Sequence, residues 1–174
     1  ITVSVGCAVA LVILASVIPF VQIDTESMPS AIVQYQDGAM NDQAEKLYFS
    51  GYYWEVKDPA SGGKVWDAAG PNNFFSRKNG VNELIPGDFS VTLELVWIHP
   101  PDTIIIRKWP ISEWTPDDFD ATHSEGEEVA RSWETHWKKT DVSFYVERSS
   151  LYGIWVYYGD AWVEYSFVVP GDDP

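Results

Sequence analysis

Residues 152–169, YGIWVYYGDAWVEYSFVV, decide the fold of this chain. Two runs rich in aromatic and β-branched residues, 152–158 and 161–169, are separated by the dipeptide Gly159-Asp160. Runs of this composition bounded by turn residues are typical of β-strands, and a two-residue loop containing glycine is typical of a hairpin. The stretch therefore predicts two neighbouring antiparallel strands in a β-rich domain.

Five earlier segments carry the same strand signal, and alternation is clearest in residues 89–98, where Val91, Leu93 and Leu95 share one face. We expect 89–98 and 103–109 to form a hairpin through the HPPD turn, and 142–148 to join the two final runs in a meander. Six or more strands with little helix predict an antiparallel β-sandwich head. The five segments are 31–36, 47–56, 89–98, 103–109 and 142–148.

Two stretches favour a helix. Residues 38–49 are compatible with a short helix, and Ser124 with Glu127 matches a capping box. Apolar and aromatic residues then recur at helical spacing from Val129 to Trp137, although a strand is the alternative for this stretch. Residues 58–88 and 110–123 are rich in Gly, Pro, Asn and Asp, which predicts long loops.

The beginning of the chain differs from the rest in composition. Residues 1–22 read ITVSVGCAVALVILASVIPFVQ, the first acid is Asp24 and the first base is Lys46. About 20 apolar residues in a helix span a bilayer core of roughly 30 Å. We therefore expect a hydrophobic helix over residues 1–27 and a globular head over 28–174, joined through the polar run at 24–29.

Charge separates the two parts as well. The formal net charge of the 174 residues is -15, and every charged side chain lies after residue 23. Nucleic-acid binding needs an excess of Lys and Arg, and so does attachment to anionic lipid. The composition therefore argues against both kinds of partner.

Three explanations for the apolar segment differ in their flanks. A secretory signal peptide needs a basic leader and a small-residue cleavage site, and neither is present in the sequence. A single-pass anchor is normally oriented by flanking Lys or Arg, which are also lacking. The third explanation is a subunit whose basic leader is removed by a peptidase, leaving the apolar segment as the N-terminus. The anchor, and a subunit of a membrane complex, remain alternatives.

On these residues the segment resembles the mature N-terminus of archaeal type IV filament subunits, the adhesion pilins and archaellins. The resemblance covers about 25 residues, together with the plan of a rod followed by a β-rich head. Bacterial type IV pilins usually carry glutamate at the fifth mature position, whereas this chain has Val5, which favours the archaeal group. The resemblance does not distinguish a pilus from an archaellum.

The resemblance implies a homopolymer, a helical filament on the cell surface whose subunits are inserted in the membrane before assembly. It also implies an assembly platform and an ATPase as partners. Small residues such as Gly6 and Ala10 would let rods approach closely, and Pro19 would loosen the last turn. The residues expected to pack in the filament core are Val3, Gly6, Ala10, Leu11, Leu14, Ile18 and Pro19.

The sequence gives little sign of catalytic or metal chemistry. His99, His123 and His136 share no metal-ligand spacing, and nucleotide-binding and hydrolase motifs are lacking. Cys7 is the single cysteine, so no disulfide forms within the chain, and it is interpreted as an apolar packing residue. We therefore predict a protein that is not an enzyme and uses no cofactor.

Two features leave room for ligands. Weak calcium candidates are Asp117, Asp118 and Asp120, with Asp172 and Asp173 as a second acidic group, although solvated acidic loops are the simpler interpretation. Nine tryptophans and nine tyrosines are expected mostly in the core. If they are exposed instead, the alternative is a membrane-anchored extracellular β-domain that binds glycans or a protein partner.

Overall fold

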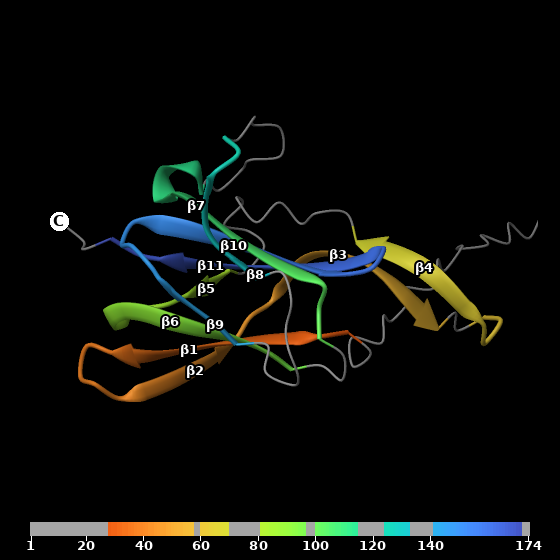
Figure 1. Cartoon of the computed structure of the whole chain (residues 1–174), viewed down its shortest axis with the longest axis horizontal. Helices are drawn as coiled ribbons and strands as arrows, with labels where there is room; N and C mark the ends of the chain where they lie inside the picture. Colours follow the sequence, from red (N-terminus) through yellow and green to blue (C-terminus); the bar gives the residue numbers. More distant parts are fainter. Residues whose placement is uncertain are drawn as a thin grey trace, which may run out of the picture.

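A computed structural model describes residues 28–57, 60–69, 81–96, 100–114, 124–132 and 141–171. This part of the chain is mainly β, and its antiparallel strands form two sheets in a sandwich-like arrangement (Figure 1). The predicted helix over 1–27 lies outside the described residues. Within them, no helix is long and apolar enough to cross a membrane.

The smaller sheet has four strands in the order β2-β1-β6-β9. Strands β1 and β2 form a hairpin in which Asp37 accepts hydrogen bonds of 2.9 Å from the amides of Ala39 and Asn41. These bonds favour the charged carboxylate and hold the pKa of Asp37 below its usual range. The strands are β1 (Ser30–Asp37), β2 (Asp42–Lys46), β6 (Pro86–Val96) and β9 (Asp141–Tyr145).

The larger sheet has seven strands in the order β4-β3-β11-β10-β7-β8, and β5 pairs with β11 in parallel. The predicted hairpin of the two final runs is confirmed: β10 and β11 pair from end to end, and Gly159 in the turn has φ +60°. The strands are β3 (Phe49–Lys57), β4 (Lys64–Ala69), β5 (Asn82–Glu83), β7 (Thr103–Pro110), β8 (Glu127–Ser132), β10 (Ser150–Tyr158) and β11 (Ala161–Val169).

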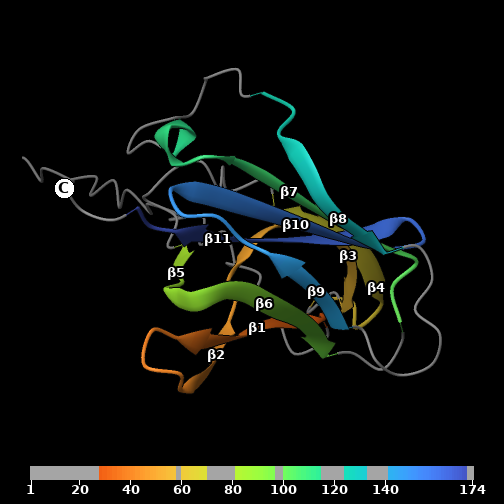
Figure 2. The same ribbon diagram turned by 60° about the vertical axis from the view of Figure 1, so that its left-hand side comes forward.

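The hairpin predicted from 89–98 and 103–109 is wrong, because β6 and β7 belong to different sheets. Both edges of β6 are already paired, with β1 on one side and β9 on the other. The apolar faces of both strands contribute to the same core cluster from opposite sheets. The chain also crosses between sheets from β9 to β10, so the predicted three-strand meander is limited to its last two strands (Figure 2).

Neither predicted helix is present in the described residues: each stretch contains a strand instead, which was the stated alternative for the second one. Residues 42–46 pair with β1, and 127–132 pair with β7 as strand β8. The edges of β1 and β7 present backbone N–H and C=O groups that need hydrogen-bond partners. A helix pattern in the local sequence does not register these distant edges, which bind the two segments as strands. The region predicted as a loop over 58–88 contains β4, β5 and the start of β6.

The core lies between the two sheets. Val33 and Leu93 come from the smaller sheet, Ile104 and Ile154 come from the larger one, and all four side chains are fully buried. Each such side chain contributes roughly 1.5–3 kcal/mol relative to exposure in water. This burial fixes which face of each strand points inward, and therefore which residues remain outside.

Candidate functional site

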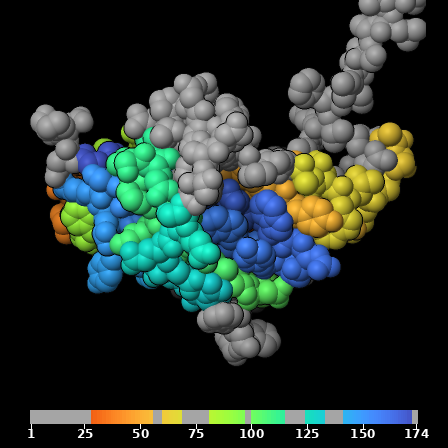
Figure 3. Space-filling view, turned by 90° about the horizontal axis from the view of Figure 1, so that it is seen from above, coloured from red at the N-terminus to blue at the C-terminus, as the bar shows by residue number. Residues whose placement is uncertain are grey.

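The outward faces of the two sheets carry different side chains. On the smaller sheet many are polar, although Val96 and Tyr145 are exposed there as well. Gln34 donates a hydrogen bond of 2.6 Å to Glu94, and the Thr92 and Ser143 hydroxyl oxygens lie 2.9 Å apart. The larger sheet turns aromatic residues outward, on the face built by β8, the β10–β11 hairpin and β3–β4 (Figure 3). Partly exposed aromatic residues gathered on one face of a sheet are a candidate interaction surface.

Three outward aromatic residues lie in register on neighbouring strands of the larger sheet. Tyr157 on β10 is opposite Trp162 on β11, which is opposite Tyr53 on β3. The Trp66 ring on β4 stacks on Tyr53 with ring centroids 4.8 Å apart, and Trp66 remains 49% exposed. These four residues, which we call the aromatic row, run across the strands.

A hollow of about 270 Å³ opens at the Tyr157 end of the row. The register places Ile105 on β7 opposite Trp155 on β10, and the Trp109 and Trp155 rings meet edge to face with centroids 5.9 Å apart. Aromatic walls with a few polar groups are the usual composition of a small-molecule site. This site, which we call the aromatic hollow, is lined by Ile105, Arg107, Trp109, Glu125, Trp155 and Tyr157.

Two hydrogen bonds hold the wall formed by residues 124–126 against β7. The Trp109 Nε1 donates to the Ser124 carbonyl oxygen at 2.8 Å, and an Arg107 amino group donates to the Glu125 carbonyl oxygen at 2.8 Å. Gly126 has φ +70°, and a Cβ atom there would lie 2.4 Å from Trp109 Cε2. Glycine is therefore required at 126 both for its backbone conformation and for the position of the indole.

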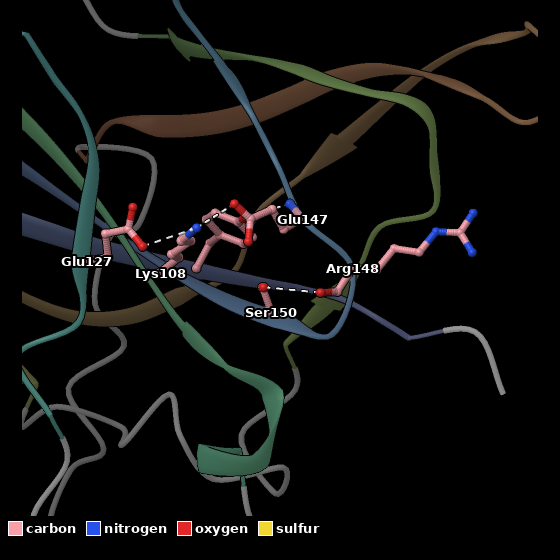
Figure 4. Close-up of polar contacts among 6 residues, drawn as sticks. Lys108, Glu127, Glu147, Arg148 and Ser150 are labelled. Atoms are coloured by element: carbon pink, nitrogen blue, oxygen red, sulfur yellow. Dashed lines mark hydrogen bonds and ion pairs between the residues drawn. The ribbon is translucent and has the colours of Figure 1, made fainter. Parts of the chain in front are cut away.

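A wider groove of about 640 Å³ continues from Trp109 and Glu125 around the end of β7. Lys108 forms ion pairs there with Glu147 at 2.5 Å and Glu127 at 3.2 Å, and its side chain is only 16% exposed (Figure 4). The hydrogen bond to Glu147 is the main cause of the raised Lys108 pKa, which its partial burial opposes. Arg148 points away from this cluster and lies over the Phe89 ring.

Glu164 is a buried carboxyl group on the outward face of β11, in register with Trp155. A register shift between β11 and β3 makes Ser50 an extra residue, so that Ser50 and Gly51 both face Glu164. Burial raises the Glu164 pKa, and the neighbouring Ser50 and Trp155 side chains oppose this effect only in part. Its Oε1 atom has no hydrogen-bond partner among the residues that the structure describes.

The residues predicted from the sequence to form sites are not brought together in the described part of the chain. The rod positions from Val3 to Pro19, Cys7, and the acidic groups at 117–120 and 172–173 lie outside it. So do all three histidines. Across the described ranges, no three His, Cys, Asp or Glu side chains are grouped so that they could hold a metal ion.

The expectation that tryptophans and tyrosines lie mostly in the core is confirmed only in part. Among the described residues the buried ones are Trp54, Trp109, Tyr52, Tyr152 and Tyr165, whereas Tyr48, Trp66 and Tyr145 are exposed. Of the six tryptophans within the described ranges, only Trp54 belongs to the main core cluster. Along β10 both alternating sets are apolar, so periodicity does not say which set faces inward. Packing between the sheets selects Tyr152, Ile154 and Val156, and leaves Trp155 and Tyr157 outside.

Comparison of the chain with family models, curated proteins and solved structures finds no match.

Proposed function

We propose that this chain is a structural subunit of an extracellular helical filament, which polymerises through residues 1–27 and displays the β-sandwich as its head. The observation that supports this proposal is the division of the chain into two unlike parts. No charged residue occurs before Asp24, whereas the sandwich begins at Ser30 and carries an acidic surface. Met28 and Pro29, at the end of the polar junction, are already buried, so the head begins within a few residues of Asp24.

The assembly would be driven by packing of the rods. A rod that buries on the order of 1,000 Å² of apolar surface gains roughly 25 kcal/mol relative to water, before the cost of association. A rod that moves from a bilayer into the filament core gains far less, because lipid is also apolar. Assembly from the membrane would therefore need an energy source, which is consistent with an assembly ATPase. Identical heads would contact each other through two different surfaces of each head. When the rotation that relates neighbouring subunits does not close a ring, such contacts generate a filament.

Electron microscopy tests the proposal by comparing the purified protein with its Gly6→Leu variant. We expect filaments from the natural sequence, and fewer or shorter filaments from the variant, because leucine prevents close rod contact at residue 6. Val12→Leu is the control, since it exchanges one large apolar residue for another outside the expected packing positions. Normal filaments from the Gly6 variant would exclude close packing there.

A second candidate function is a membrane-anchored binding module. The outward aromatic row and the aromatic hollow favour it, because a head that serves only as a spacer has no need of them. The same micrographs distinguish the two: monodisperse particles in detergent, with no filaments under any assembly condition, contradict the filament and support the anchored module.

A further inference from the structure

We propose that the aromatic hollow binds an uncharged sugar ring, as part of a neutral oligosaccharide or polysaccharide. The inference gives the second candidate function its site and ligand class, and it applies equally to the head of a filament subunit. It rests only on residues of β7, β10 and the 124–126 segment, so it does not depend on polymerisation.

The shape of the hollow suits a ring with one apolar face. Trp155 and Tyr157 are two residues apart on β10 and point outward, and Ile105 lies opposite Trp155 on β7. A pyranose carries C–H groups on its faces and hydroxyl groups around its rim, so it can stack on such side chains while its rim stays polar. A volume of about 270 Å³ is near the lower end of the range for small-molecule sites, which suits one or two sugar rings.

The polar groups of the hollow match the rim of a sugar. Arg107 supplies only hydrogen-bond donors, and the exposed Glu125 carboxylate supplies only acceptors. The hydroxyl groups of a sugar can accept hydrogen bonds from Arg107 and donate hydrogen bonds to Glu125. The hydrogen bonds from Trp109 to the Ser124 carbonyl oxygen and from Arg107 to the Glu125 carbonyl oxygen hold the Arg107 side chain and the backbone of this wall in place before a ligand arrives, which lowers the entropic cost of binding.

Charge selects among the possible occupants. The chain carries a formal net charge of -15, but the hollow is lined by one base and one acid and is locally neutral. The hollow offers a second acidic head no excess of positive charge. A cation or an anion would find no excess of opposite charge, whereas an uncharged polyhydroxyl ligand meets no electrostatic penalty.

The test is binding of neutral hexasaccharides to the full-length protein in a zwitterionic detergent that contains no sugar. Cellohexaose, mannohexaose and N-acetylated chitohexaose are titrated while tryptophan fluorescence is recorded, with polygalacturonate and chitosan oligomers as charged comparisons. We expect saturable binding of at least one neutral hexasaccharide that responds little to salt. Tyr157→Ala, which removes a stacking ring, and Glu125→Gln should each weaken it, the former about tenfold.

Trp66→Ala is the matched control, because it removes an exposed aromatic residue of the aromatic row outside the hollow. It should leave affinity within about twofold, and thermal melting confirms that each variant is folded. No binding by any neutral hexasaccharide, binding restricted to the charged comparisons, or unchanged affinity in both hollow variants overturns the proposal. Loss of head-to-head association in Tyr157→Ala without an effect on sugar identifies a second copy as the occupant, and also overturns it. Micrographs report filament formation separately, so failure of either proposal is recognised independently.

Discussion

The Tyr165 hydroxyl group donates a hydrogen bond of 2.5 Å to the carbonyl oxygen of Pro29, a residue 136 positions earlier in the chain. Tyr165 is fully buried on β11 in the larger sheet, and Pro29 directly precedes β1 of the smaller sheet. This contact attaches the entry of the chain into the head to the middle of the opposite sheet.

Tyr165→Phe should therefore destabilise the head by about 1–3 kcal/mol, because it leaves the buried Pro29 carbonyl group without this donor. Tyr158→Phe is a matched control, since the Tyr158 hydroxyl is buried and has no hydrogen-bond partner within the described ranges. That substitution should be neutral or stabilising. Urea denaturation of the full-length protein measures both, and equal losses in the two variants would contradict the role given to the Tyr165–Pro29 bond.

Glu164→Gln should make the head more stable at pH 8 and reduce its loss of stability as the pH rises. Burial raises the pKa of Glu164 in the folded state, so the folded protein holds a proton that the unfolded chain has released. The contribution of Glu164 to the stability of the head is complete below the pKa of about 4.3 in the unfolded chain. It declines as the pH rises through the higher pKa of the folded state. Glu83→Gln, at an exposed position, is the control. Parallel stability–pH curves for the natural protein and Glu164→Gln would contradict the prediction.

Lys108→Met should cost about 1 kcal/mol near neutral pH, because Glu127 and Glu147 are left facing each other without the ammonium group. The raised Lys108 pKa means that its contribution is complete below about pH 10.4 and is lost as the pH rises through the folded value. The two proteins should therefore converge in stability at strongly alkaline pH. Lys64→Met, which removes an exposed pair with Glu55, should cost less than about 0.5 kcal/mol.

Gly126→Ala should disturb the aromatic hollow, whereas Gly62→Ala should only strain the backbone. The two glycines have nearly the same φ, +70° and +72°, but no atom of the described residues lies within 4 Å of a Cβ atom at Gly62. We expect about 1 kcal/mol of strain at Gly62 and a larger loss at Gly126, where the indole of Trp109 must move. Near-UV circular dichroism should change only for Gly126→Ala, and an unchanged spectrum would show that the indole tolerates the methyl group.

Strands were predictable from the sequence where local composition decides them. The runs that became β1, β3, β6, β7, β10 and β11 carry β-branched and aromatic residues between turn residues, and the Gly159-Asp160 turn has a local cause. The pairing of β6 could not be read in this way. Its partners β1 and β9 are distant in sequence, whereas β7 is its neighbour along the chain but lies across the core.

The aromatic hollow could not be predicted, because its residues resemble those of the core. Trp109 and Trp155 lie on strands in which both faces are apolar, and only the packing of the two sheets decides which side is outward. Glu125 and Gly126 join the site because residues 127–132 pair with β7, and the local sequence there favoured a helix. The pattern did predict that a large set of aromatic residues would be available.

The position of β11 has a consequence for the order of events during synthesis. Strand β11 lies between β3 and β10 and also pairs with β5, yet it ends at Val169. All of the strands that pair with β11 leave the ribosome before it does. Until residues 161–169 emerge, no strand connects β3 to β10. The larger sheet therefore closes only after residues 161–169 have been made, and the head remains open until then.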